Sequence, residues 1–352
     1  MHYYWVHLCL FLSTAVNARL RVAFLSDLHV GEACFPIPYN GTDDCNCITN
    51  DRRAIAHINS LSPPVDAVII TGDITSSAWP SQFSKAYELL NVLTVPYYLT
   101  MGNHDVWSYE QEGGYETRGP YGDQLFGATF GHLLKSSPNV SGYLNESVYN
   151  PIYNTTSTFQ NFQLTLTDKE TGVKLAFFAG DFSTREAATC ANCSGVPGWA
   201  ERGLSDFNGG TLPWLRSQLQ TEAAKPEAER ANRLFLIQHQ PISCPFYMPD
   251  FLFCFGVADK VLLVQTLTES WPKSAWFGVF SGHLHVFDNV TVPFSEWPEF
   301  RELETSAAKG DALNKDVASS VMVVEFAGVE VDSIEMHSFS LSSETWTVRK
   351  GQ

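Results

Sequence analysis

The chain has 352 residues, a hydrophobic content of 44%, a charged content of 17% and a formal net charge of −16 at pH 7. This length allows one large domain or two small ones, and the composition excludes a disordered or membrane-embedded chain. The negative charge argues against a broad surface for nucleic acid or anionic membranes.

The chain begins with an apolar segment, WVHLCLFLSTAVNA at 5–18, which ends in the small-residue pattern Val-Asn-Ala. This ending is typical of a signal-peptide cleavage site, and the segment is short for a membrane span. The start of the leader carries histidines but no Lys or Arg. We expect 1–18 to be a secretory signal peptide, with no membrane anchor after cleavage. An apolar strand or a retained anchor is the alternative.

Six Asn-x-Ser/Thr sequons support secretion and predict N-glycans. They begin at Asn40, Asn139, Asn145, Asn154, Asn192 and Asn289. We therefore expect a secreted protein, or one in the lumen of the secretory pathway or of a lysosome-like compartment.

Eight cysteines fit the same compartment, and Cys9 would leave with the leader. The others are Cys34, Cys45, Cys47, Cys190, Cys193, Cys244 and Cys254. Cys244 and Cys254 could close a short loop, and Cys34 could pair with Cys45 or Cys47. The CxxC pair could bond internally or to distant partners. The odd number predicts one free thiol.

Short apolar runs that stop at Gly, Asp or His are typical of strands buried on both faces. They are RLRVAFLSD (19–27), VDAVIITGD (65–73), VPYYLTMGNHD (95–105), VKLAFFAGD (173–181), RLFLIQHQ (233–240) and AWFGVFSGHLH (275–285). The intervening segments predict helices at roughly 50–60, 80–93, 212–225 and 257–269.

Two further segments predict antiparallel strands. Residues 161–178 read as a hairpin around Glu170-Thr171-Gly172, and 321–339 alternates between apolar and polar residues. Strand–helix alternation followed by hairpins indicates an α/β sandwich with mixed sheets.

One stretch lacks long periodic segments. Residues 106–157 are rich in Gly, Tyr and Asn and carry three sequons. We expect an irregular glycosylated insertion here, either a lid beside a site or a decorative loop. The remainder of 19–352 is expected to form a single domain.

The carboxyl ends of the predicted strands carry carboxylate, amide and imidazole side chains, and ligands in α/β sheets collect at such ends. Imidazole and carboxylate together suit Zn, Fe or Mn, and one central aspartate could bridge two ions. The blocks are Asp27-Leu28-His29, Gly72-Asp73, Gly102-Asn103-His104-Asp105, His239 and Gly282-His283-Leu284-His285.

The order D-x-H, G-D, G-N-H-D, H and G-H-x-H, over about 21–290, resembles the calcineurin-like metallophosphoesterase superfamily. Each block is weak alone, but all five in order, each after an apolar run, are specific. The resemblance implies an α/β fold, a four-layer α-β-β-α sandwich in which helices flank two mixed sheets. It also implies a phosphoester hydrolase with two divalent or trivalent metal ions, Zn, Mn or Fe.

The resemblance also implies a role for each site residue. The first ion would be held by Asp27, His29, Asp73 and His285. The second ion would be held by Asp73, Asn103, His239 and His283. A hydroxide bridging the two ions would attack phosphorus, and His104 would aid the leaving group. Asp105 would orient His104 by accepting its other N–H.

Other polar residues fit no such role. Asp181 ends a similar apolar run, but the family has a strand there without a ligand. His57, His132 and His337 match no block and are expected to be ordinary residues.

Purple acid phosphatases begin with D-x-G and place a tyrosine three residues after the bridging aspartate, where this chain has Ser76. Their iron–tyrosinate site is therefore disfavoured. Acid-sphingomyelinase-like phosphodiesterases share D-x-H and are one alternative, although no saposin-like domain precedes the core. A metal-free binding scaffold of the same fold is an alternative of another class. A small-molecule or lipid phosphoester is the expected substrate, with monoester and diester both open.

Overall fold

The computed structural model describes residues 19–34, 40, 41, 43, 45–106, 122–151, 155–183, 203–244, 254–285, 288–291, 297, 300–309 and 314–350. The predicted leader at 1–18, the CxxC pair and the sequons at Asn154 and Asn192 lie outside these residues. In the described part, no helix combines the length and the apolar character needed to cross a bilayer.

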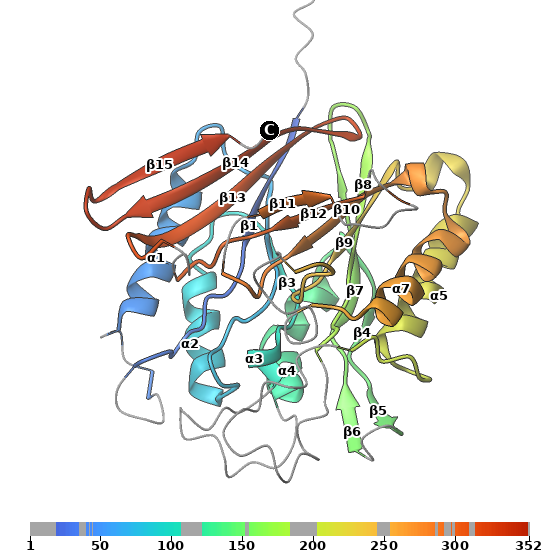
Figure 1. The fold of residues 1–352 in the computed structure, drawn as a ribbon, viewed down its shortest axis with the longest axis horizontal. Coiled ribbons are helices and arrows are strands. Elements are labelled where there is room, and N and C mark those ends of the chain that lie inside the picture. Colours follow the sequence, from blue (N-terminus) through green and yellow to red (C-terminus); the bar gives the residue numbers. More distant parts are fainter. Residues whose placement is uncertain are drawn as a thin grey trace, which may run out of the picture.

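Two mixed sheets form the centre of the molecule (Figure 1). The first has the order β15 (Thr345–Lys350), β14 (Glu330–Ser340), β13 (Val317–Ala327), β1 (Arg19–Leu25), β2 (Ala67–Ile70), β3 (Tyr97–Leu99). The second has the order β11 (Asp288–Thr291), β12 (Arg301–Glu304), β10 (Trp276–Ser281), β9 (Arg233–Ile237), β8 (Lys174–Ala179), β7 (Asn161–Thr167), β4 (Val140–Leu144). A separate small hairpin pairs β5 (Ser147–Asn150) with β6 (Thr155–Thr158).

Helices cover the outer face of each sheet. In Figure 1, α1 (Asn46–Ser60) and α2 (Pro80–Leu90) lie on the left beside the first sheet. On the right, α5 (Thr211–Ala224) and α7 (Val257–Ser270) lie beside the second sheet. The short α3 (Asn103–Val106) and the longer α4 (Gly122–Ser136) lie below the first sheet in this view. This arrangement confirms the predicted four-layer α-β-β-α sandwich.

Strand β1 illustrates why these runs are apolar throughout. Ala23 and Leu25 pack in the cluster under α1 and α2, whereas Val22 and Phe24 pack in the cluster between the two sheets. Phe24 stacks on Phe280 of β10, with ring centroids 4.0 Å apart. Because successive side chains of a strand face opposite sides, a strand covered on both faces must be apolar at every position.

The predicted elements match the observed ones closely, with one error. The four helices begin or end within a few residues of the predicted limits, and β7 and β8 form the predicted hairpin. The expectation of an irregular insertion at 106–157 is wrong in its described part, because α4, β4 and β5 lie there.

The missed helix α4 has a regular apolar spacing that glycines concealed. Phe126, Phe130 and Leu134 follow one another at intervals of four residues, and all three are buried. Gly127 and Gly131 lower the helix propensity of this segment. A Cβ at Gly131 would lie 2.8 Å from the Tyr143 hydroxyl oxygen, so the glycine leaves room for the end of this side chain.

The disulfides decide between the alternatives left by the sequence. Cys244 pairs with Cys254 as expected, and Cys34 pairs with Cys45. Cys47 keeps a free thiol and is buried.

Candidate active site

The five predicted blocks meet at the carboxyl ends of β1, β2, β3, β9 and β10. Backbone bonds join the loops within each sheet: the His29 N–H donates to the Asp73 carbonyl at 2.9 Å, and the Gly282 N–H donates to the His239 carbonyl at 2.9 Å. Across the sheets, the His283 N–H donates to Asp27 Oδ2 at 3.0 Å. These bonds bring blocks that are far apart in sequence into one site.

One carboxylate oxygen lies between two imidazoles. Asp73 Oδ2 is 3.4 Å from His29 Nε2 and 3.1 Å from His239 Nε2. Asp27 Oδ1 lies 3.2 Å from His285 Nε2 and 3.7 Å from His29 Nε2. Asp27 Oδ1 also lies 3.9 Å from His239 Nε2, so these side chains form one connected cluster.

The ligand atoms gather into groups within 4.8 Å of one another. The groups are Asp27, His29 and His285; Asp73, His239 and His283; and His29, Asp73 and His104. Asn103 is fully buried at the first residue of α3, and the next residue, His104, donates its backbone N–H to Asp73 Oδ1 at 2.9 Å. The structure thus brings all predicted site residues to one place and separates His283 from His285.

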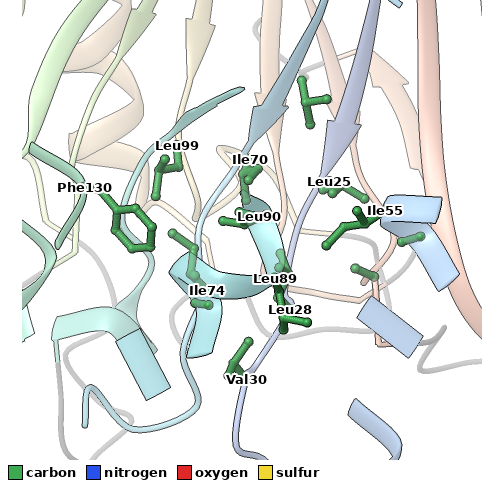
Figure 2. Packing of buried hydrophobic residues seen from close by; sticks show 14 of the residues in the cluster. Leu25, Leu28, Val30, Ile55, Ile70, Ile74, Leu89, Leu90, Leu99 and Phe130 are labelled. Atoms are coloured by element: carbon green, nitrogen blue, oxygen red, sulfur yellow. The ribbon is translucent and has the colours of Figure 1, made fainter. Parts of the chain in front are cut away.

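Apolar side chains anchor three of the five loops from behind. Leu28, between Asp27 and His29, and Ile74, directly after Asp73, point into the cluster beneath α1 and α2 (Figure 2). Leu284 packs against Cys254 of the second disulfide. Polar ligands therefore alternate with buried anchors along these loops.

The loop backbones adopt a conformation that most residues avoid. Five site residues have positive φ: Asp27 (52°), His29 (47°), Asp73 (50°), His283 (77°) and His285 (59°). This left-handed region is uncommon outside glycine and costs about 1–3 kcal/mol per residue. Such strain persists where surrounding contacts fix it, which is typical of functional sites.

Two glycines leave room for the carboxylates of Asp73 and Asp27. A Cβ at Gly102 would lie 2.1 Å from Asp73 Oδ1, and a Cβ at Gly282 would lie 2.8 Å from Asp27 Oδ2. Both positions therefore require the absence of a side chain.

Gly102→Ala is expected to displace the Asp73 carboxylate, because the added Cβ atom and the carboxylate would occupy the same space. We expect a loss of metal affinity and a fall in the free energy of unfolding of about 1–3 kcal/mol. Metal titration and urea unfolding measure both. Gly256→Ala is the matched control, because a Cβ there meets nothing within 4 Å. Equal behaviour of the two variants would contradict this account.

The charges of the site depend on each other. Burial raises the pKa of Asp27 and of Asp73, but nearby histidines, led by His285 and His239 respectively, bring both pKa values well below the usual range. Burial lowers the pKa of His29 to about 3, so its imidazole is neutral. Burial also opposes the charge on His239, but Asp73 and Asp27 raise its pKa to about 9. In this setting, a cation bound at the centre would replace the His239 proton.

The donor set fits a metal ion. In the part of the chain that the structure describes, His29 Nδ1, His29 Nε2 and Asp27 Oδ1 are buried without a hydrogen-bond partner. Buried polar atoms of this kind are rare and are typical of sites that bind an ion or water. Imidazole with carboxylate suits Zn, Mn or Fe.

His104 is oriented by a backbone carbonyl. His104 Nδ1 lies 2.6 Å from the Ser76 carbonyl oxygen, and because a carbonyl only accepts, Nδ1 must carry the proton. His104 is half-buried, and its ring meets His29 edge-on with centroids 4.5 Å apart. The bond at Nδ1 thus fixes the tautomer and the orientation of the His104 ring.

The expected contact between Asp105 and His104 is wrong. The Asp105 carboxylate accepts backbone N–H bonds from Ile74 (3.1 Å), Thr75 (2.8 Å) and Gly102 (3.0 Å), and one from the Thr75 hydroxyl (2.9 Å). Asp105 thus connects the loop after β2 to the loop after β3. The Ser76 carbonyl, and not Asp105, accepts the hydrogen bond that orients the His104 ring.

Sequence reasoning also missed two supports of His239. The Thr71 carbonyl lies 2.9 Å from His239 Nδ1. Glu302 on β12 accepts N–H bonds from Ile242 (2.6 Å) and Ser243 (2.9 Å), which hold the loop after His239. A backbone carbonyl has no sequence signature, and an isolated glutamate has a weak one.

Glu302 is expected to make stability depend on pH. Burial raises the pKa of Glu302 to about 7. The folded state therefore holds a proton that the unfolded state releases near pH 4.3. The free energy of unfolding falls as the pH rises between these values, by on the order of 3 kcal/mol from this group. Urea unfolding of wild type and Glu302→Gln at several pH values tests this, because the variant should have a smaller slope. Parallel curves would contradict it.

The segment that contains the site matches a known protein family. Residues 20–287 match the family model for calcineurin-like phosphoesterases. A stretch of 84 residues is 37% identical to "Probable glycerophosphodiester phosphodiesterase" of Arcobacter nitrofigilis, covering 24% of this chain and 29% of that protein. The match thus spans less than a third of that relative.

Solved structures align with this chain at low sequence identity. A purple acid phosphatase from yellow lupin seeds aligns with a TM-score of 0.50 and 13% identity, over 94% of this chain and 53% of that one. The anchor in the inner membrane complex of Plasmodium aligns with a TM-score of 0.49 and 12% identity, over 95% of this chain and 88% of that one.

Proposed function

The chain belongs to the calcineurin-like phosphoesterase family, and we propose that it is a phosphoric ester hydrolase with two metal ions in its active site. The observation that carries this proposal is the position of Asp73 Oδ2 between His29 Nε2 and His239 Nε2, at 3.4 and 3.1 Å. A carboxylate placed between two imidazole groups is suited to bridging two cations.

We propose that each half of the site holds one ion. The first is assigned to Asp27, His29, Asp73 and His285. The second is assigned to Asp73, Asn103, His239 and His283. The grouping of Asp27 with His285 and of Asp73 with His283 supports this division. The ions, Zn, Mn or Fe, would supply charge for the phosphate oxygens and a nucleophilic water at neutral pH.

His104 is proposed to protonate the leaving oxygen. Because Nδ1 donates to the Ser76 carbonyl, the ring can give up a proton from Nε2 without losing its orientation. The bond from the His104 backbone N–H to Asp73 Oδ1 fixes this acid beside the shared carboxylate. Asp105 is proposed to support this arrangement through the two loops that it joins.

Small phosphodiesters are the first substrate class to test, because the segment from Arcobacter belongs to a protein named for glycerophosphodiesters. The experiment compares hydrolysis of bis-p-nitrophenyl phosphate, p-nitrophenyl phosphate and a glycerophosphodiester by metal-quantified protein. Faster diester turnover would support the proposal. Preference for the monoester would redirect it to phosphatase substrates, and no turnover with two bound ions would point to a narrower pocket.

Two alternatives receive less support. None of the three proteins described above is named as a sphingomyelinase, so they give that branch no support. A metal-free scaffold is disfavoured because three groups of His and Asp side chains that could hold a metal ion are present at the site.

We propose secretion, or residence in the lumen of the secretory pathway, for the mature protein. The Cys34–Cys45 and Cys244–Cys254 disulfides support an oxidising compartment. A loss of apparent mass after enzymatic deglycosylation of protein from secreting cells tests this assignment.

A further inference from the structure

A lysine, Lys309, lies at the edge of the site on a segment that is bonded to both sheets. The Thr305 N–H donates to the carbonyl of Ser281, the last residue of β10, at 2.9 Å. Three residues later, the Ala308 N–H donates to the carbonyl of Ser26, directly after β1, at 2.8 Å. Ser26 and Ser281 each precede a block of ligand residues in the sequence. The backbone of Lys309 therefore starts beside the loops that carry these ligands.

The charge of the Lys309 ammonium acts on a predicted metal ligand. Among the causes that lower the pKa of His29, the Lys309 charge comes second after burial and ahead of the His104 charge. The rings of His104 and His29 are close to each other, with centroids 4.5 Å apart. Because the interaction between charges weakens with distance, the ammonium also lies near the His29 imidazole.

The ammonium has an acidic partner on the loop after β1. Lys309 Nζ donates to Glu32 Oε2 at 2.5 Å, and Glu32 is its only hydrogen-bond partner among the described residues. The Glu32 N–H donates to the His29 carbonyl at 2.9 Å, and the charges of His29 and His285 act on the Glu32 carboxylate. The Lys309 charge also acts on the buried Asp51, but the Asp51 oxygens accept no hydrogen bond from the described residues.

This ion pair is placed so that it can exchange partners. The Glu32 side chain is 42% exposed and the Lys309 side chain is 15% exposed. Water readily replaces the partner of an exposed carboxylate, so such a pair adds little to stability. An ammonium group has three N–H donors, and the bond to Glu32 uses one of them. A second acceptor can therefore bind the same lysine.

A lysine at this position opposes metal binding and favours phosphate binding. A positive charge near His29 repels any metal ion that His29 helps to hold, and the Glu32 carboxylate reduces this repulsion. A phosphate group brings negative charge of its own, and its oxygens accept strong, charge-assisted bonds from an ammonium. The substrate is therefore the species that benefits from the charge of Lys309.

We propose that Lys309 binds a non-bridging oxygen of the substrate phosphate and releases Glu32 when it does so. This inference rests on the proposed function, because it places the phosphate beside His29 and His285. Glu32 is then the counter-ion of Lys309 while no substrate is bound, and it competes with the substrate for the ammonium. If the pair only linked two loops, removal of either partner would have the same effect. Exchange predicts opposite effects.

The experiment measures the inhibition constant of inorganic phosphate and the KM of bis-p-nitrophenyl phosphate at saturating Mn²⁺. Lys309→Met should raise both constants about three- to tenfold, because a partly exposed charged hydrogen bond is lost. Its metal content should not fall. Glu32→Gln should lower the inhibition constant of phosphate, because the competing charge is gone while the lysine remains. Calorimetric titration of phosphate into Mn-loaded protein gives the same comparison without turnover, so a failure of the proposed hydrolysis would not hide the result.

Lys225→Met is the matched control. Lys225 Nζ also lies 2.5 Å from a glutamate oxygen, that of Glu222, but this pair lies at the end of α5. The control should leave both constants unchanged. Weaker phosphate binding in both Lys309→Met and Glu32→Gln, or no change in either, would overturn the inference. A loss of metal in Lys309→Met would also overturn it, because this loss would indicate a structural link between the loops.

Discussion

Asp73→Asn is expected to reduce turnover by at least about 10³-fold, or about 4 kcal/mol of barrier, and to lower the metal content. Asp73 Oδ2 faces His29 on one side and His239 on the other, so one substitution weakens both halves of the site. The amide keeps the shape of the side chain but loses the charge that two cations need. Elemental analysis and diester hydrolysis measure the two effects.

Asp181→Asn is the matched control. Asp181 also follows a buried strand and a glycine, and it is fully buried, but its carboxylate accepts backbone N–H bonds from Gln160 and Ser183. It belongs to none of the His/Asp groups found among the described residues. We expect this variant to keep its metal and its turnover. Equal losses in both variants would mean that Asp73 acts only through folding.

His104→Ala is expected to keep the metal content and to lose about 10²–10⁴-fold in turnover, the range for a general acid. The loss should be smaller for substrates with a good leaving group, because p-nitrophenolate needs less protonation than an alkoxide. Comparison of bis-p-nitrophenyl phosphate with a glycerophosphodiester therefore separates the acid role from simple positioning.

His132→Ala controls for the loss of an imidazole away from the site. His132 lies on α4 and contacts the Tyr87 hydroxyl at 3.4 Å. Its replacement should leave both metal content and turnover unchanged. Normal activity of His104→Ala, or loss of metal in that variant, would contradict the assigned role.

The sequence predicted the layers and the meeting of the five blocks because strand ends in such a sheet share one edge. Apolar runs such as β1 mark burial on both faces, and the polar residue that ends each run marks the edge. The division of ligands between two ions came from the resemblance alone and stays a prediction. The structure groups Asp27 with His285 and Asp73 with His283.

The contacts of Asp105 and His104 could not be predicted in the same way. A carboxylate next to a histidine in sequence can bind either the imidazole or nearby backbone N–H groups, and the choice depends on the path of two loops. Here the backbone N–H groups of Ile74, Thr75 and Gly102 donate to the Asp105 carboxylate. The His104 imidazole donates to the Ser76 carbonyl instead. Main-chain partners have no residue type, so a sequence pattern cannot reveal them.

The most direct test of the two-metal account is anomalous scattering from crystals of Mn- or Zn-loaded protein. The account predicts two peaks about 3.5–4 Å apart, with the Asp73 carboxylate between them. Asp27, His29 and His285 should surround one peak, and Asn103, His239 and His283 the other. A single peak, or two peaks without Asp73 between them, would contradict it.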